Sequence, residues 1–340
     1  MARLTSFSRI LITLVLVAGI FFAVKTFLPR FSNSVSGPEK KEAVSGQETP
    51  SSAGQPANQP SSSSTWGSGA TLSGFKYTPP APVNGKLKGV VELGATGFNS
   101  FIINVDAQKN WKLEKAEYGA SLVYENLATD EDIKSGLKSY IADMLAYGVG
   151  PKHIHFVISS GAKKVPITTK ISGLLRGMGY FVNEVTPEQE AKLALKSCLP
   201  ASFASRAFVV DIGSGNTKVS WLSGGVLTGI ELPGAKYYQD EISDASVYQE
   251  VSAKVKQAPA ALRSTCFIIG GVPFELAKQV RSGKERYTVL KAPADYKAVG
   301  DKQRSGLNIY RAIADATGCR QFVFDWDANF TIGFLLNLPN

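Results

Sequence analysis

The chain has 340 residues, with 37 Lys and Arg against 28 Asp and Glu, a formal net charge of +9, and 44% hydrophobic residues. This length allows one large domain or two small ones in addition to non-globular segments. The lysines are scattered and form no basic block interleaved with aromatic residues, so the composition argues against a nucleic-acid-binding protein. A mildly basic surface instead suits anionic ligands or an anionic membrane surface.

The N-terminal segment has the pattern of a membrane anchor. Residues 1–9 form a basic tail with Arg3 and Arg9, and residues 10–28 are almost wholly apolar apart from Lys25. That stretch is close to the ~20 residues that a transmembrane helix requires. A cleaved signal peptide is the alternative, although no clean Ala-x-Ala cleavage site follows. We expect a single-pass N-terminal anchor at the membrane, and the Lys and Arg residues on both sides of it leave its orientation open.

Residues 29–84 have the composition of a flexible linker. They are rich in Ser, Pro, Gly, Gln and Asn and contain few aliphatic residues. Such a segment cannot bury enough apolar surface to offset the entropy lost on ordering, so we expect a disordered tether. Trp66 and residues 75–77 (FKY) interrupt this composition and are candidates for docking on the domain that follows.

From residue 85 onward the hydrophobic pattern predicts strands and helices in two consecutive lobes, residues 85–203 and 204–340. In the first lobe we expect strands at 87–94, 98–105, 111–118, 153–159 and 180–184, and helices at 128–147, 166–177 and 186–199. In the second lobe we expect strands at 207–211, 217–222, 226–232, 265–269 and 321–325, and helices at 246–257, 273–281, 301–317 and 330–338. Thr129 and Thr186 are the expected N-caps of two of these helices. The order β-β-β-α-β-α-β-α, run twice, predicts a duplicated α/β domain with its ligand site in the cleft between the lobes.

Each lobe opens with a β-hairpin that has a glycine-rich turn. Residues 90–98 read VVELGATGF, and residues 209–219 read VVDIGSGNTKV. Glycine in such a turn allows backbone N–H groups to approach a bound oxyanion, because no Cβ obstructs it. A single glycine hairpin is usually just a turn. Two of them at matched positions favour a phosphate site that both hairpins face.

The paired hairpins and the motifs that follow them resemble the exopolyphosphatase/guanosine pentaphosphate phosphatase (Ppx/GppA) family. This family belongs to the actin-like ATPase superfamily, whose lobes have ribonuclease-H-like folds. The resemblance covers about residues 88–338. Residues 92–98 (ELGATGF) resemble the family's first phosphate loop, D-x-G-S-N-S-[FL], and residues 211–218 (DIGSGNTK) resemble its second, D-[IL]-G-G-G-S-T-E. Further family segments are matched, in the same order, by residues 158–164 (ISSGAKK), 185–191 (VTPEQEA), 232–235 (LPGA) and 269–271 (IGG).

The resemblance implies a set of site residues. Catalytic roles are implied for Glu92, Asp211 and Glu190, and Asp211 is also implied as a ligand of Mg²⁺, the expected cofactor. Ligand-binding roles are implied in and beside the two loops for Gly94, Ala95, Thr96, Gly97, Lys163, Lys164, Gly213, Ser214, Gly215, Asn216, Thr217, Lys218, Gly270 and Gly271.

Three departures from the family pattern change the charge or the reach of the site. Lys164 stands where the family has its catalytic Glu, Lys218 stands at the terminal Glu of the second loop, and Glu92 replaces an Asp. A protonated lysine cannot take a proton from an attacking water, and phosphohydrolysis needs carboxylates to position water and to hold Mg²⁺. As surface residues, the lysines would simply be solvated; as cleft residues, they would add positive charge for an anion.

These features predict a membrane-tethered domain that binds a phosphorylated ligand (a nucleotide, polyphosphate or an alarmone) in the cleft between its lobes, with weak or no hydrolysis. The first alternative is an active exopolyphosphatase or pppGpp phosphohydrolase, which would cleave phosphoanhydrides. The second alternative is a non-catalytic structural component of an envelope assembly that keeps the fold without its ligand. The sequence identifies no protein partner.

Overall fold

The computed structural model describes residues 75–94, 97–118, 129–164 and 166–339. The predicted basic tail, anchor and most of the predicted tether, residues 1–74, lie outside the described residues. Ala95, Thr96 and the side chain of Lys164 lie outside them as well. Within the described ranges, no helix combines the length and the hydropathy needed to cross a bilayer.

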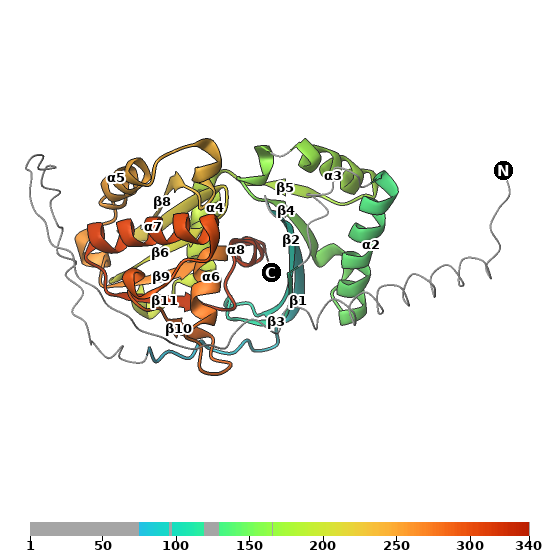
Figure 1. The fold of residues 1–340 in the computed structure, drawn as a ribbon. Helices are drawn as coiled ribbons and strands as arrows, with labels where there is room; N and C mark the ends of the chain where they lie inside the picture. The colour runs from blue at the N-terminus through green and yellow to red at the C-terminus, as the bar shows by residue number, and fades with distance from the viewer. Residues whose placement is uncertain (1–74, 95–96, 119–128, 165, 340) are drawn as a thin grey trace, which may run out of the picture. The chain divides into compact units, whose positions relative to one another are not determined.

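Two separate β-sheets form the framework of the domain (Figure 1). The first sheet has the order β3-β2-β1-β4-β5 and consists of β1 (Lys86–Gly94), β2 (Gly97–Val105), β3 (Trp111–Tyr118), β4 (Ile154–Ile158) and β5 (Val182–Glu184). The second has the order β10-β11-β9-β6-β7-β8 and consists of β6 (Ala207–Ile212), β7 (Asn216–Ser223), β8 (Val226–Pro233), β9 (Thr265–Ile269), β10 (Tyr287–Val289) and β11 (Gln321–Asp325).

Both sheets follow the same pairing plan. β1 pairs with β2, and β2 with β3, in antiparallel fashion, whereas β1 pairs with β4, and β4 with β5, in parallel. In the second sheet, β6, β7 and β8 are antiparallel in the same way, and β6, β9 and β11 are parallel. This topology confirms the predicted duplication. The short edge strand β10, antiparallel to β11, was not predicted, and it has no counterpart among the described strands of the first sheet.

The helices lie close to their predicted positions. They are α2 (Asp130–Tyr147), α3 (Pro166–Gly177), α4 (Pro187–Cys198), α5 (Asp244–Val255), α6 (Gly271–Lys278), α7 (Gly300–Thr317) and α8 (Phe330–Asn337). Thr129 and Thr186 are N-caps, as predicted, and each forms a complete capping box, with Asp132 and Gln189 respectively. The box satisfies backbone N–H groups that the first helical turn would otherwise leave unpaired.

The helices pack against the two sheets, and the buried side chains form three hydrophobic cores. α2 and α3 share one core with the first sheet, and α5 and α7 share another with the second. A third core contains α4, α8 and residues of both sheets, including Val90 of β1 and Val209 of β6. α4 contacts β6, β7 and β8, while α8 contacts both α4 and β1. These two helices therefore join the lobes and position the loops between them.

The packed domain starts earlier than residue 85. The ring centroid of Phe75 lies 5.1 Å from that of Phe203, 5.2 Å from that of Tyr287 and 5.6 Å from that of Phe267. Tyr77 also contacts the rings of Phe203 and Tyr287. Aromatic pairs at these separations stabilise packing beyond their buried area. The end of the predicted tether therefore docks on the domain.

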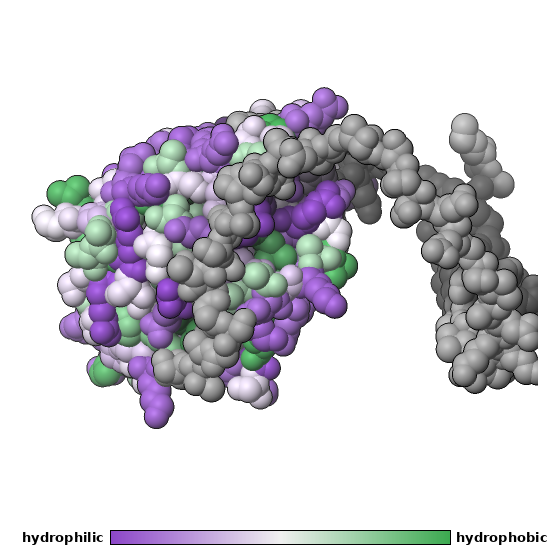
Figure 2. All heavy atoms as spheres, turned by 60° about the vertical axis from the view of Figure 1, so that its left-hand side comes forward, coloured by the Kyte–Doolittle hydropathy of each residue, from purple (hydrophilic) through white to green (hydrophobic). Residues whose placement is uncertain are grey.

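The surface of the described domain is mixed in polarity. Figure 2 shows one face, over which hydrophilic side chains are spread with hydrophobic ones scattered among them. The most exposed large hydrophobic residues come from separate parts of the chain: Val83, Phe181, Val226 and Val299. Single exposed apolar side chains of this kind are normal on soluble domains. The features that bear on function lie in the cleft between the lobes.

Candidate functional site

A cavity of about 350 Å³ lies where the two hairpins meet, between the two sheets. Its walls contain eleven of the residues predicted from sequence: Glu92, Gly94, Glu190, Asp211, Gly213, Ser214, Gly215, Asn216, Lys218, Gly270 and Gly271. These residues come from β1, α4, β6, the turn between β6 and β7, β7 and the start of α6. The folded chain thus brings both glycine hairpins to one cleft, as the duplicated plan predicts.

The remaining predicted residues lie elsewhere. Lys163 is 38% exposed and pairs with Glu184 at 3.4 Å, so its ammonium is held at the end of β5 and outside the cleft walls. Thr217 is fully buried in β7, and its hydroxyl has no hydrogen-bond partner within the described residues. Gly97 begins β2, opposite Gly94 in the register of the hairpin. The predicted roles of Ala95, Thr96 and Lys164 concern two residues and one side chain that lie outside the described residues.

Two glycines of the second lobe, Gly215 and Gly270, lie directly against the backbone of neighbouring segments. A Cβ on Gly215 would lie 3.4 Å from the Cα of Gly161, in the loop after β4 of the first lobe. Gly270 has a φ of +107°, and a Cβ there would lie 2.3 Å from the carbonyl oxygen of Ile212. Any larger residue at Gly270 would be strained and would also clash. Close packing alone therefore requires glycine at Gly270, whether or not a phosphate binds beside it.

Lys218 lies at the centre of a buried ionic cluster. Its side chain is 5% exposed, and its ammonium forms an ion pair with Oε1 of Glu190, which is 2% exposed. Oδ2 of Asp211 lies 3.8 Å from the same nitrogen. Burial lowers the pKa of Lys218, but the charges of Asp211 and Glu190 outweigh it, so the pKa is raised and the lysine stays charged. The sequence suggested either a solvated surface lysine or a cleft lysine whose charge is available to an anion. The structure differs from both, because Lys218 is buried and its charge is already paired with carboxylates.

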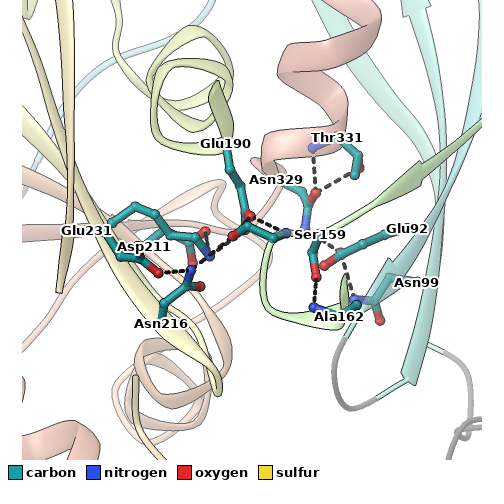
Figure 3. Close-up of polar contacts among 12 residues, drawn as sticks. Glu92, Asn99, Ser159, Ala162, Glu190, Asp211, Asn216, Glu231, Asn329 and Thr331 are labelled. Atoms are coloured by element: carbon teal, nitrogen blue, oxygen red, sulfur yellow. Dashed lines mark hydrogen bonds and ion pairs between the residues drawn. The ribbon is translucent and has the colours of Figure 1, made fainter. Parts of the chain in front are cut away.

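The other oxygen of Glu190 is fixed by the loop after β4. The backbone N–H of Ser160 donates to Oε2 of Glu190 at 2.9 Å, and the Ser160 hydroxyl donates to the same oxygen at 2.5 Å. The side-chain amide of Asn216 donates to the Ser160 hydroxyl at 2.9 Å and to Oε1 of Glu231 at 2.7 Å. Figure 3 shows this chain of contacts running from the second sheet to Glu190. The network ties both lobes to one carboxylate.

Glu92 stands apart from the lysine cluster. Its Oε2 accepts hydrogen bonds from the side-chain amides of Asn99, at 3.0 Å, and Asn329, at 3.1 Å (Figure 3). Burial raises the pKa of Glu92 to about 7, and the nearby charges of Glu190 and Asp211 contribute in the same direction. Near neutral pH, Glu92 therefore exists in comparable amounts as the acid and as the carboxylate.

The cluster does not fit the Mg²⁺ that the family resemblance implies. Mg²⁺ takes oxygen ligands and is usually held through one or two carboxylates together with water. Here the ammonium of Lys218 contacts Glu190 and lies 3.8 Å from Asp211, the two carboxylates that would serve. Across the part of the chain that the structure describes, no group of three or more His, Cys, Asp or Glu side chains is placed to hold a metal ion.

Two features of the cleft carried no sequence motif. Tyr118, Phe274 and Trp326 line one side of it, with ring centroids 5.8 Å apart for Tyr118 and Phe274 and 5.4 Å apart for Phe274 and Trp326. Lys302, in the first turn of α7, lines it near Gly271. Burial, together with the charge of Lys236, lowers the pKa of Lys302. These side chains come from segments far apart in sequence, and no local pattern distinguishes them.

The comparisons with known proteins agree with this architecture. No family model and no curated protein matches the sequence. The Ppx/GppA enzyme of Aquifex aeolicus has a similar fold, with a TM-score of 0.58 at 16% identity, covering 74% of this chain and 99% of that one. An exopolyphosphatase from Cytophaga hutchinsonii gives a TM-score of 0.58 at 12% identity, covering 74% of this chain and 96% of that one. The domain therefore has a two-sheet α/β fold similar to that of these Ppx/GppA proteins.

Proposed function

We propose that this chain is a membrane-tethered domain that binds a phosphorylated ligand in the cleft between its lobes, with weak or no hydrolysis. The observation that carries the proposal is the meeting of both glycine hairpins at one cavity that also contains Lys302. A backbone loop without side chains and a lysine ammonium are both suited to phosphate oxygens. The similar folds of Ppx/GppA proteins support the same ligand class.

The arrangement of charge favours binding over catalysis. Hydrolysis requires a carboxylate that can orient or deprotonate water. Four carboxylates of the described residues line the cleft: Glu92, Glu190, Asp211 and Asp325. Glu190 forms an ion pair with Lys218 and two hydrogen bonds with Ser160, and Asp211 faces the same ammonium. Asp325 accepts two hydrogen bonds from Arg286. These three carboxylates are engaged in structural contacts with cations, which leaves Glu92 as the candidate base.

The aromatic wall favours a ligand that carries a planar ring. Tyr118 is 59% exposed at the end of β3 and contacts Phe274 of α6, so both lobes contribute aromatic rings beside the glycine loops. Lys278 and Arg281 lie over the rings of Phe274 and Trp326, so Tyr118 offers the ring that is most open to a ligand. Stacking on such rings stabilises a bound base, whereas bare polyphosphate has no group for them. Within the class of phosphorylated ligands, we therefore favour a nucleotide over polyphosphate.

A titration of the full-length chain in detergent tests the proposal. Trp326 lines the cleft, so its fluorescence can report binding, and Trp326→Phe identifies its share of the signal. We expect saturable binding of ADP, weaker binding of tripolyphosphate, and phosphate release far below that of an ordinary phosphohydrolase. If nucleotides, pyrophosphate and polyphosphate all fail to show saturable binding, the proposal is wrong. The alternative of a structural component without a ligand would then be favoured.

Lys302 provides a charge test with a matched control. A charge-assisted hydrogen bond contributes about 1.5–3 kcal/mol, so Lys302→Ala should weaken ADP binding by roughly ten-fold or more. Lys254→Ala is the control, because Lys254 lies on α5, is 45% exposed and pairs with Glu250 at 2.7 Å. Equal affinities for the two variants would show that the ligand does not contact Lys302.

A second candidate function is slow phosphohydrolysis with Glu92 as general base. The raised pKa of about 7 favours it, because a general base works best when its pKa is near the operating pH. Released phosphate should then increase as pH rises through about 7, and Glu92→Gln should abolish the reaction. A Glu92→Gln variant that releases phosphate at the wild-type rate would exclude this role.

The membrane anchor remains part of the proposal. Residues 10–28 are apolar over a length that suits one transmembrane helix. We expect the full-length chain to sediment with membranes and to resist alkaline extraction, and a variant without residues 1–30 to be released. Sequencing the N-terminus of the mature protein separates the anchor from the signal-peptide alternative, which requires a new N-terminus beyond the apolar stretch.

A further inference from the structure

The lysine at the centre of the cleft has more contacts than a mobile ligand-binding group needs. Lys218 stands on β7, opposite Asp211 in the register of the β6–β7 hairpin. Its side chain is 5% exposed, and those of Glu190 and Asp211 are 2% and 10% exposed. The ammonium is therefore enclosed by carboxylate oxygens from two elements, α4 and β6.

The surrounding contacts keep the ammonium in place. Glu190 cannot swing away, since Ser160 holds its second oxygen through both its backbone N–H and its hydroxyl. Asn216 in turn holds the Ser160 hydroxyl. The carboxylate is thus fixed from the first lobe on one side and from Lys218 on the other, so the cluster is a structural unit that spans the cleft.

A divalent cation and this ammonium cannot share the cluster. An ion that coordinates both Glu190 and Asp211 would stand within a few ångströms of a like charge that contacts the same carboxylates, in a site with little water to screen them. Displacing the lysine would leave its charge without partners in a buried place, which is strongly unfavourable.

We propose that Lys218 is the permanent cation of the cleft, taking the place of a divalent metal between Asp211 and Glu190, so that ligand binding is independent of metal. The claim that ligand binding is independent of metal rests on the proposed function. The claim that Lys218 takes the place of a metal concerns only the chain's own residues. The proposal has a direct corollary. Removal of the ammonium leaves two buried carboxylates beside an open cavity, one of them held by Ser160. Two carboxylates are the donor set that Mg²⁺ and Mn²⁺ accept when water completes the shell.

Binding of Mn²⁺ to the full-length chain tests the claim that Lys218 takes the place of a metal, with free Mn²⁺ measured by electron paramagnetic resonance. At equal micromolar concentrations, wild-type protein should leave the free Mn²⁺ signal unchanged, and Lys218→Ala should remove about one ion per chain. Adding Asp211→Asn to Lys218→Ala should restore the free signal. Lys163→Ala is the matched control, since it removes an exposed, ion-paired lysine outside the cleft and should bind no Mn²⁺.

Mg²⁺ gives a second readout, thermal stability. Millimolar Mg²⁺ should raise the melting temperature of Lys218→Ala and leave that of wild-type protein unchanged, because an ion that binds only the folded state stabilises it. Should Lys218→Ala fail to fold, Lys218→Gln keeps the side-chain volume and offers an oxygen ligand for the same measurement. Wild-type protein that binds one Mn²⁺ per chain, with the binding lost in Asp211→Asn, overturns the proposal. A folded Lys218 variant that gains no Mn²⁺ also overturns it.

Ligand titrations test metal independence separately. ADP and pyrophosphate should bind wild-type protein with equal affinity in EDTA and in Mg²⁺. Binding that requires Mg²⁺ overturns metal independence. If neither ligand binds under either condition, the proposed function fails, and the Mn²⁺ measurement still decides whether Lys218 takes the place of a metal.

Discussion

The raised pKa of Glu92 predicts that this residue makes the folded domain less stable as pH rises. The pKa of Glu92 is raised from its ordinary value of 4.5 to about 7 in the folded state. Between these two values the folded state binds more protons than the unfolded state, so the free energy of unfolding falls as pH increases through this window. Glu92→Gln removes the titration and should remove this share of the pH dependence.

The size of the effect follows from the two pKa values. At ~1.4 kcal/mol for each pKa unit, a change from 4.5 to about 7 corresponds to about 3 kcal/mol in full, of which about 2.5 kcal/mol falls between pH 5 and pH 8. Glutamine is a close substitute, because its carbonyl oxygen can accept the hydrogen bonds that Asn99 and Asn329 now donate to Oε2 of Glu92. Relative to wild type, the variant should therefore gain about 2–3 kcal/mol of stability on going from pH 5 to pH 8.

Urea unfolding at pH 5, 6, 7 and 8 measures this difference. Asp325, whose pKa burial raises to about 6, and Asp211, whose pKa burial also raises, are present in both proteins, so most of their contribution cancels in the comparison. Glu250→Gln serves as the control, because Glu250 is 43% exposed on α5 and pairs with Lys254. Parallel stability curves for wild type and Glu92→Gln would refute the reasoning and would place Glu92 in ordinary contact with water.

Three further substitutions test a glycine of the cleft, the docking of residue 75 and a helix cap, each by urea unfolding. Gly270→Ala should cost about 3 kcal/mol or more, because the residue has a φ of +107° and its new Cβ would lie 2.3 Å from a carbonyl oxygen of β6, whereas Gly271→Ala meets only a lysine nitrogen at 3.8 Å and should cost less than ~1 kcal/mol. Phe75→Ala should cost about 2–3 kcal/mol through its lost aromatic contacts, and Phe181→Ala, which is 82% exposed, should stay within ~0.5 kcal/mol of wild type. Thr186→Ala should cost about 1 kcal/mol by removing the cap of α4, and no change would mean that the first turn is capped in another way.

Local sequence signals were sufficient for most of the fold. The strands β3, β9 and β11 and the helix α3 have the bounds that their hydrophobic patterns and flanking residues predict. The N-caps Thr129 and Thr186 could be predicted from sequence, because a capping box joins residues only three positions apart. β10 escaped prediction because it is short and is held at the sheet edge by β11, a segment more than thirty residues later in the chain.

The candidate site was predictable only where local sequence motifs mark it. The hairpin loops carry a pattern that can be read locally, and the structure brings both to one cavity. The aromatic wall has no such pattern, because Tyr118, Phe274 and Trp326 meet only after both lobes are assembled. The same holds for Asn329, which reaches Glu92 from just before α8 across 237 positions of sequence.

The lysine of the second loop shows why a charge change inside a motif is difficult to interpret from sequence. Replacement of an acidic residue by Lys218 suggests a gain of positive charge for an anion, but its effect depends on partners that the motif does not contain. Glu190 comes from α4, and its orientation depends on Ser160 of the first lobe. Compared with the motif that the sequence resembles, Lys218 stands in place of one carboxylate and engages two others in buried contacts. Under the function that we propose, we therefore expect this arrangement to weaken hydrolysis more than the loss of a single acidic residue would, while the glycine loops still suit a phosphate.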